Sequence, residues 1–136
     1  MRLTGAAALL VAALITFSCG GVTDPSSNKT ETFNGTITAR GGQSQSFTFS
    51  VANTGEFTVK VTSMIPTYSS VFGVYYGQGS SSGCQPFAGG INPSVTVNAP
   101  ALSGQIFKGD YCVVVYDSIG AFPTTGETFT MTVSHP

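Results

Sequence analysis

The chain has 136 residues, with five Lys and Arg, six Asp and Glu and one His, which gives a formal net charge of -1. A nucleic-acid-binding protein needs an excess of Lys and Arg to neutralise phosphates, so this composition excludes that class. Charged residues make up only 8% of the chain, and Gly, Ser and Thr fill 51 positions, which excludes coiled coils and long helical bundles. The length fits one domain rather than a multidomain enzyme.

An export signal is predicted at the N-terminus. Met1 and Arg2 form a short positive start, and an apolar run of 15 residues follows from Leu3 to Phe17. A helix that spans a bilayer needs about 20 apolar residues, so this shorter run is typical of a cleaved secretory signal. We therefore expect residues 1–18 to be removed from the mature protein.

The end of this signal resembles the lipobox of bacterial lipoproteins, because Ser18 stands directly before Cys19 in the segment Ile-Thr-Phe-Ser-Cys. The resemblance implies that Cys19 becomes the lipidated first residue and holds the protein on a membrane of the bacterial envelope. Gly20, rather than Asp, follows the cysteine, which by resemblance to lipoprotein sorting favours the outer membrane over the inner one. Thr16 and Phe17 depart from the commonest lipobox residues, and the alternative is an ordinary signal peptide with a cysteine near its end.

The cysteine count of three is odd, which calls for an explanation in an exported protein. If Cys19 carries lipid, Cys84 and Cys112 remain as a natural pair in an oxidising compartment. The sequence therefore predicts one intramolecular disulfide, which would close a loop of 29 residues.

Residues 19–30 are predicted to be the lipidated cysteine and a flexible tether. The stretch from Gly20 to Thr30 is small, polar and interrupted by Pro25, so it has too little apolar surface to offset the entropy of ordering. The remaining residues, 31–136, are predicted to form one domain.

From Glu31 onward, apolar and polar residues alternate with period two, and no helical period is present. Such alternation places one face of a strand on a core and the other in water. About 7–9 mostly antiparallel strands separated by turn residues predict an all-β fold, a single β-sandwich or jelly roll. The clearest strand candidates are residues 46–51, 57–62, 71–76, 111–116 and 128–133, with weaker ones at 33–39, 95–98 and 105–107. The stretch from Gly77 to Pro93 is predicted to be a long irregular loop.

Two segments near the C-terminus carry a family resemblance. Residues 108–117 read Lys-Gly-Asp-Tyr-Cys-Val-Val-Val-Tyr-Asp, and residues 127–133 read Glu-Thr-Phe-Thr-Met-Thr-Val. With the Phe-x-Phe-x-Val and Gly-x-Phe-x-Val-x-Val strands before them, they resemble the bacterial pre-peptidase C-terminal (PPC) β-sandwich domains. The resemblance covers residues 31–134 and implies a non-catalytic domain of an exported protein. Calcium, which some members bind, is not implied, because the matching segment at residues 70–75 contains no Asp.

No catalytic or metal site is predicted. The run from Gly79 to Gly83 matches the G-x-S-x-G nucleophile motif around Ser81, but no helix is expected to follow it. His135 is the second-last residue and is expected to be mobile. Asp110 and Asp117 are expected near opposite ends of one strand as turn residues, so neither a metal site nor a cofactor is predicted.

The expected function is therefore that of a non-catalytic, lipid-anchored envelope module that binds a protein or a polysaccharide, or has a structural role. The alternative is a carbohydrate-binding accessory module, in which exposed aromatic rings would contact sugars. Tyr68, Tyr76 and Phe122 are the residues expected to do so, and Tyr75 is expected to point to the face opposite Tyr76. A small secreted hydrolase that uses Ser81 or His135 is the third hypothesis.

Overall fold

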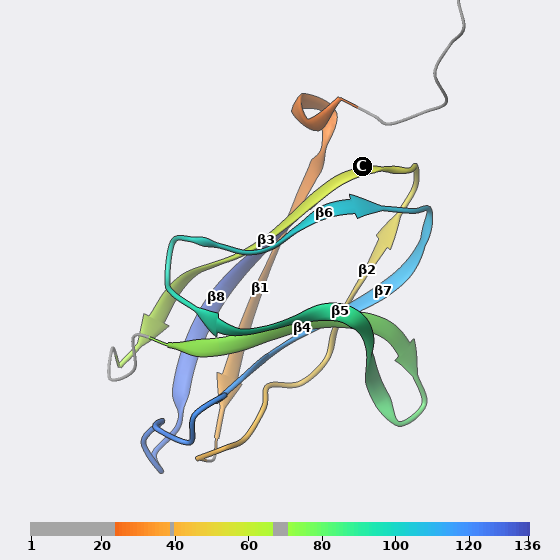
Figure 1. Ribbon diagram of the computed structural model, residues 1–136. Coiled ribbons are helices and arrows are strands. Elements are labelled where there is room, and N and C mark those ends of the chain that lie inside the picture. Colours follow the sequence, from red (N-terminus) through yellow and green to blue (C-terminus); the bar gives the residue numbers. More distant parts are fainter. Residues whose placement is uncertain (1–23, 39, 67–70) are drawn as a thin grey trace, which may run out of the picture.

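The computed structural model describes residues 24–38, 40–66 and 71–136, and within them it shows two four-stranded antiparallel sheets packed face to face (Figure 1). One sheet has the order β1-β8-β3-β6 and the other β2-β7-β4-β5. The predicted all-β sandwich is confirmed. The strands are β1 (Lys29–Ile37), β2 (Phe47–Val51), β3 (Gly55–Ile65), β4 (Phe72–Ser80), β5 (Gly83–Val95), β6 (Pro100–Ile106), β7 (Gly109–Tyr116) and β8 (Glu127–His135).

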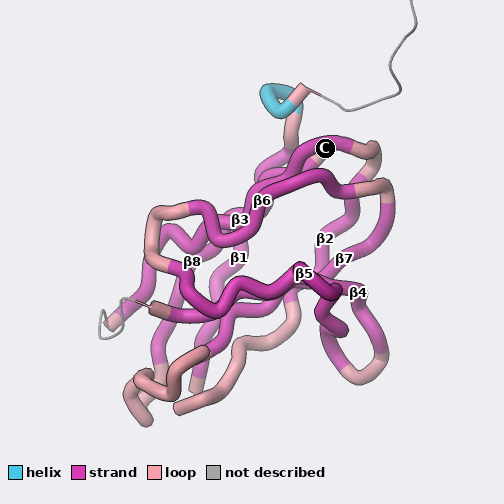
Figure 2. The backbone as a smooth tube through the Cα atoms, viewed as in Figure 1, coloured by secondary structure: helices cyan, strands magenta, loops and turns pink. Residues whose placement is uncertain are grey.

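The pairing of the strands is nested. β1 pairs with β8, β2 with β7, β3 with β6 and β4 with β5, so the chain folds back on itself about the β4–β5 turn. A long nested hairpin rolled into two sheets is the arrangement of a jelly roll. Loops that include residues 40–46 and 117–126 gather at the lower end of the view, and the β6–β7 turn lies toward the other end (Figure 2).

The core lies between the two sheets and is made by the alternation that the sequence displays. In β2 and β8 every second residue is buried, because one face of each strand meets the opposite sheet. β7 is central in its sheet, and four successive residues of it, Cys112 to Val115, are buried. The largest fully buried apolar side chains are Phe72, Phe122, Ile37, Ile106 and Met131.

The folded chain begins earlier than residue 31. Asp24 caps a short 3-10 helix, Pro25–Ser27, through a hydrogen bond of 2.9 Å from the Ser26 amide. Asn28 then donates to the carbonyl oxygen of Glu56 over 2.8 Å, and β1 starts at Lys29. β8 continues to His135 and supplies the partner for Lys29, which explains the earlier start. The predicted signal peptide, Cys19 and the first part of the predicted tether lie outside the described residues.

The prediction of an irregular loop from Gly77 to Pro93 is wrong, because these residues belong to the β4–β5 hairpin. The hairpin is not regular: its register shifts between Phe72 and Val74 and again between Tyr75 and Gly77. Small and glycine-rich segments tolerate such bulges, and their composition hides the strand period in the sequence. Within the described residues, no helix is long and apolar enough to cross a membrane.

Candidate functional site

Two hollows are each lined in part by Tyr111 of β7, and we refer to them together as the Tyr111 site. The smaller, of about 200 Å³, lies between the two sheets. The larger, of about 400 Å³, lies beside the β4–β5 hairpin, on the outer face of the β2-β7-β4-β5 sheet. The smaller is lined by Tyr76, Phe87, Gln105, Ile106, Phe107 and Tyr111. The larger is lined by Thr48, Phe49, Ser50, Gln78, Gly79, Asp110 and Tyr111.

A cluster of aromatic rings forms the apolar part of this site. The Tyr111 ring centroid lies 5.7 Å from that of Phe49, 6.1 Å from that of Phe87 and 6.4 Å from that of Tyr76. Tyr76 also packs on Phe57 of the opposite sheet at 4.9 Å. These distances lie within the usual range for interacting aromatic pairs. The rings therefore support one another and form a fixed surface.

Strand geometry explains why the rings gather here. Tyr111 has the same parity as the core residues Val113 and Val115, and Tyr76 has the same parity as Val74, so both rings are on the inner faces. Tyr76 and Tyr111 are only half-buried, and both line the smaller hollow. The inner face of the sheets thus continues as an aromatic surface that solvent reaches.

A hydrogen bond fixes the hydroxyl end of the Tyr111 side chain. Its hydroxyl group donates a hydrogen bond of 2.9 Å to the carbonyl oxygen of Phe107, in the β6–β7 turn. Burial raises the pKa of Tyr111 above its ordinary value, although the bond to Phe107 opposes this. The hydroxyl group therefore stays protonated at neutral pH and remains a donor.

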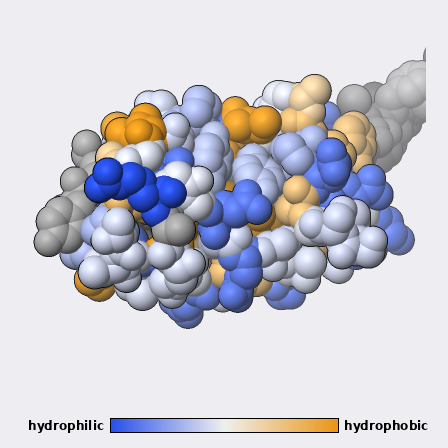
Figure 3. All heavy atoms as spheres, turned by 90° about the horizontal axis from the view of Figure 1, so that it is seen from below, coloured by the Kyte–Doolittle hydropathy of each residue, from blue (hydrophilic) through white to orange (hydrophobic). Residues whose placement is uncertain are grey.

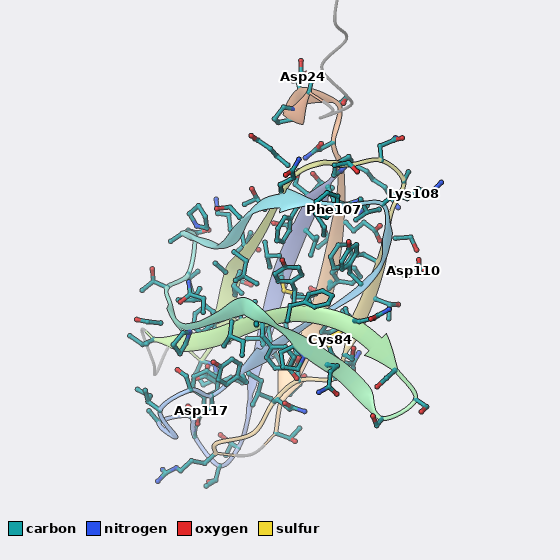
Figure 4. The ribbon with its side chains drawn as sticks, turned by 45° about the vertical axis from the view of Figure 1, so that its right-hand side comes forward. Asp24, Cys84, Phe107, Lys108, Asp110 and Asp117 are labelled. Carbon is teal, nitrogen blue, oxygen red and sulfur yellow. A yellow bond between two sulfur atoms is a disulfide. The ribbon has the colours of Figure 1, made fainter. Side chains whose placement is uncertain are left out.

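Polar groups line the larger hollow. Ser50 and Asp110 are directly opposite each other on β2 and β7, and the Ser50 hydroxyl donates to Asp110 Oδ1 over 2.6 Å. Phe107, Lys108 and Asp110 project together from the region of the β6–β7 turn (Figure 4). The Phe107 side chain is 63% exposed. Ser50 and Asp110 are exposed and alternate with the inward Phe49 and Tyr111, so the polar larger hollow and the aromatic smaller hollow lie on opposite faces of this sheet.

The predicted disulfide between Cys84 and Cys112 is confirmed, with the two Cα atoms 5.6 Å apart. It ties the β4–β5 hairpin to β7 at the residue after Tyr111. Gly77 allows β4 and β5 to approach each other closely beside the bridge, because a Cβ atom there would collide with the main-chain carbonyl of Gln85. The bridge and Gly77 together hold Gln78 and Gly79 over the larger hollow.

The aromatic residues that were predicted to contact a ligand lie in different parts of the structure. Tyr76 lies in the Tyr111 site, and Tyr75 points to the opposite face, where its ring packs 5.8 Å from that of Tyr116. The expectation for Phe122 is wrong, since its side chain is fully buried in the core. Asp117 explains this: its carboxylate accepts the amides of Ala121 and Phe122 over 3.1 Å and turns the loop inward. Tyr68 lies outside the described residues.

Sequence reasoning placed Tyr111 in a strand and Asp110 in a turn but did not identify either as a site residue. Phe49 and Phe87 were missed as well. The signal available in the sequence was the aromatic residue Phe107 directly before the Lys108-Gly109-Asp110 turn. What it lacked was the fold of the β4–β5 hairpin, which brings Phe87 and Gln78 to the same place.

Ser81 and His135, the residues of the hydrolase hypothesis, belong to different sheets. Ser81 lies in the turn between β4 and β5, whereas His135 is the last residue of β8. The expectation that His135 is mobile is wrong: the residue is 1% exposed, and its Nε2 atom lies 3.0 Å from Glu31 Oε1. β8 lies between β1 and β3, so its end is held on both sides.

Asp110 and Asp117 lie toward opposite ends of β7, as predicted (Figure 4). Among the residues that the structure describes, no three His, Cys, Asp or Glu side chains gather as ligands for a metal ion. Asp117 instead uses its carboxylate on main-chain amides, including that of Gly41 at 2.8 Å.

Other surfaces of the described residues have fewer features of a binding site. Seen from below, the molecule is mostly hydrophilic, and its apolar residues form separate patches (Figure 3), as is ordinary for a soluble domain surface. A third hollow, of about 290 Å³, lies against β1, β3 and β8 and is lined largely by Thr, Ser and Asn side chains. It brings together fewer aromatic rings than the Tyr111 site.

Comparison of the chain with protein-family models, with curated proteins and with solved structures gives no match.

Proposed function

We propose that this protein is a non-catalytic binding module of the bacterial cell envelope, exported, anchored by lipid on Cys19 and able to hold an envelope component in the Tyr111 site. The observation that carries the proposal is the half-open aromatic cluster around Tyr111, whose hollow is also lined by Gln105. Ligand sites are typically concave, largely aromatic or apolar, and supplied with a few polar groups.

The construction of the site supports binding rather than packing alone. Rings that only fill a core are covered, whereas the side chain of Phe107 is 63% exposed and Tyr76, Phe87 and Tyr111 are half-buried. A disulfide holds one wall and a hydroxyl bond holds the central ring. A preformed site loses less entropy when it binds a ligand, so this rigidity favours affinity.

The sequence supports the location. The lipobox-like segment that ends in Cys19 and the resemblance of residues 31–134 to PPC domains both indicate an exported protein with an accessory role. By resemblance to lipoprotein sorting, Gly20 favours the outer membrane. A disulfide fits an oxidising compartment, since such bonds are rare in the cytosol.

The test uses the mature chain, residues 19–136, with Cys19→Ser so that it stays in solution. The protein is mixed with lipid-extracted envelopes of the bacterium that produces it, and the fraction that sediments is measured against envelope concentration. We expect saturable binding that Tyr111→Ala weakens at least tenfold. Tyr75→Ala, which removes a half-buried tyrosine from the opposite face, is the matched control and should bind as the parent does. No saturable binding, or equal losses in both variants, would refute the proposal.

A further inference from the structure

The four edge strands of the sandwich differ in how they are protected. They are β1 and β6 in one sheet and β2 and β5 in the other. An edge strand presents main-chain N–H and C=O groups that have no neighbouring strand, and proteins usually protect such edges with proline or charged side chains. β5 contains Pro86 and Pro93, β6 begins with Pro100, and β1 carries Lys29 and Glu31. β2, with the sequence Phe-Thr-Phe-Ser-Val, has neither a proline nor a charge.

We infer that β2 is a docking edge, to which an extended segment of a protein partner adds as a further strand and places a Lys or Arg side chain at Asp110. Strand addition of this kind takes its affinity from main-chain hydrogen bonds and its specificity from side-chain pockets. The aromatic hollow of the proposed function lies between the sheets, so this contact is additional to it. The choice of partner rests on the lipid anchor proposed above.

The larger hollow supplies a side-chain contact on the outer face beside β2. Thr48 and Ser50 are the exposed residues of β2, and Ser50 is directly opposite Asp110 on β7. Asp110 is exposed, and among the described residues it forms no ion pair. Neighbouring strands lie about 5 Å apart, so a strand added to β2 lies about 10 Å from β7. A long basic side chain on its outer face reaches across Ser50 to the Asp110 carboxylate, where a charge-assisted hydrogen bond can form.

The inner face requires apolar residues in the same segment. Side chains of a strand alternate between its two faces, so the neighbours of the basic residue point toward the other sheet. There the edge strand β1 places Phe33, which is half-buried and packs 5.3 Å from Phe47 of β2. The part of the Phe33 ring that solvent reaches is available to an apolar side chain. The partner segment therefore alternates apolar and basic residues.

A second copy of the chain fits this edge less well. β2 carries no basic residue that could pair with Asp110 of another copy. Two identical antiparallel strands in one sheet are related by a two-fold axis perpendicular to that sheet, which points the anchored ends of the two copies in opposite directions. Cys19 lies at most about 18 Å from Asp24, so two copies paired in this way are not both held in one membrane. The partner is therefore a different protein.

The side-chain part of the inference is tested with residues 19–136 that carry Cys19→Ser and with three fluorescent ten-residue peptides. One peptide alternates Val and Arg, one alternates Val and Glu, and the third has the composition of the first in an order without alternation. We expect the alternating Arg peptide to bind at least tenfold more tightly than the other two in an anisotropy titration. Asp110→Lys should reverse the preference between the Arg and Glu peptides. Glu56→Lys, which changes an exposed carboxylate on the other sheet, is the matched control and should keep the preference of the parent.

The main-chain part is tested by hydrogen exchange of the same protein with and without the Arg peptide. We expect amides of β2 that point away from β7 to exchange at least tenfold more slowly with the peptide, and amides of the edge strand β5 to be unaffected. No binding of the Arg peptide, equal binding of the alternating and shuffled peptides, or binding that leaves exchange in β2 unchanged would each overturn strand addition. A dimer whose β2 amides are protected without any peptide would overturn the choice of partner.

This inference and the proposed function can fail separately. Sedimentation with lipid-extracted envelopes and the Tyr111→Ala variant reports on the proposed function. Peptide binding with the Asp110→Lys variant reports on the β2 edge. Loss of one result leaves the other as it is.

Discussion

Asp117 shows how one side chain can organise a loop region. At the end of the sandwich away from the Tyr111 site, its carboxylate accepts the amides of Gly41, Ala121 and Phe122. Burial opposes ionisation of this group, but the amides of Gly41, Phe122, Ala121 and Ile119 together lower the pKa of Asp117 below its ordinary value. The ionised form is thus the one that the fold stabilises.

The sign of this shift gives a pH prediction. Because the pKa of Asp117 is lower in the folded state, its stabilisation is complete above about pH 4 and is lost as the pH falls through the folded pKa. We expect Asp117→Asn to lower the free energy of unfolding at pH 7 by roughly 1.5–3 kcal/mol. The difference from the parent should shrink as the pH falls below about 4, because the Asp117 carboxylate is increasingly protonated. Thermal unfolding of both proteins at several pH values measures this difference. Glu56→Gln, which changes an exposed carboxylate, is the control. A stability difference that does not depend on pH would contradict the role of the ionised Asp117.

Gly77 and Gly79 offer a matched pair of glycine substitutions two residues apart on β4. A Cβ atom at Gly77 would collide with the main chain of Gln85, whereas a Cβ atom at Gly79 meets nothing within 4 Å. We expect Gly77→Ala to destabilise the domain by about 1–3 kcal/mol, the usual cost of overpacking. Gly79→Ala should be neutral or slightly stabilising, since it restricts the unfolded chain. Equal denaturation midpoints for the two variants would show that the close approach of the strands at Gly77 is not required.

The sequence predicted side-chain direction well where strands are regular and poorly where side chains bond to the main chain. Period two placed Tyr75 and Tyr76 on opposite faces, as the structure has them. It could not reveal that Phe122 is buried, because that follows from the bonds between Asp117 and the loop. Nor could it reveal that Phe87 and Tyr111 meet, since this depends on how two distant strands pack.

At the scale of elements, the β4–β5 hairpin and its disulfide are the least regular part of the fold. The bridge between Cys84 and Cys112 spans 28 positions and ties the hairpin to the central strand β7. On the chain-entropy account, closing a loop of this length stabilises a domain by about 3–4 kcal/mol.

Removal of the bridge therefore gives a prediction for this element. We expect the double variant Cys84→Ser and Cys112→Ser to unfold about 10 °C or more below the parent, given about 4 °C or more per kcal/mol for a domain of this size. Reductant should lower the melting temperature of the parent by a similar amount and leave that of the double variant unchanged. Two alkylatable thiols in the unreduced, denatured form with Cys19→Ser would instead show that the disulfide is absent.

Strands with clean alternation were predicted close to their actual bounds, whereas of the bulged hairpin only the start of β4 was predicted, as residues 71–76. Residues 46–51 include β2 and begin one residue before it, and residues 111–116 and 128–133 lie within β7 and β8. The rest of the β4–β5 hairpin was not predicted, because its register shifts break the alternation of apolar and polar residues. The segment at residues 95–98 was expected to be a strand, yet β5 ends at Val95 and β6 begins at Pro100.

For the molecule as a whole, the chain enters the sandwich near the Tyr111 site. Asp24 and the β6–β7 turn with Phe107 and Lys108 lie toward the same end (Figure 4). Only five peptide steps separate Cys19 from Asp24, which at full extension cover at most about 18 Å. If Cys19 is lipidated as proposed, the Tyr111 site is held close to the membrane surface and meets polymers that lie near it.

Lipid anchoring is tested directly by Cys19→Ser in the full chain. We expect the parent to fractionate with membranes and to partition into detergent, and the variant to be released into the soluble exported fraction, because the acyl chains supply the membrane affinity. The mass of the mature N-terminal peptide gives an independent measurement. A variant that stays with membranes as firmly as the parent, or a parent that carries no lipid, would contradict the anchoring.

The sequence alone indicated the class of fold, since period-two alternation and the absence of a helical period leave few architectures. It did not indicate the nested order of the strands, which depends on long-range pairing such as that of β1 with β8. The Tyr111 site was not predicted for the same reason, because six strands contribute to its aromatic cluster and hollows.

The most direct measurement of the central claim compares two apolar side chains of equal exposure. Phe107, at the Tyr111 site, and Ile119, in the loop region at the other end, are each 63% exposed, so neither substitution by alanine should disturb the fold. Binding of the two variants to lipid-extracted envelopes is measured by titration, with residues 19–136 and Cys19→Ser as the parent. We expect Phe107→Ala to bind at least tenfold more weakly and Ile119→Ala to bind as the parent does. Equal affinities for the two variants would contradict the account.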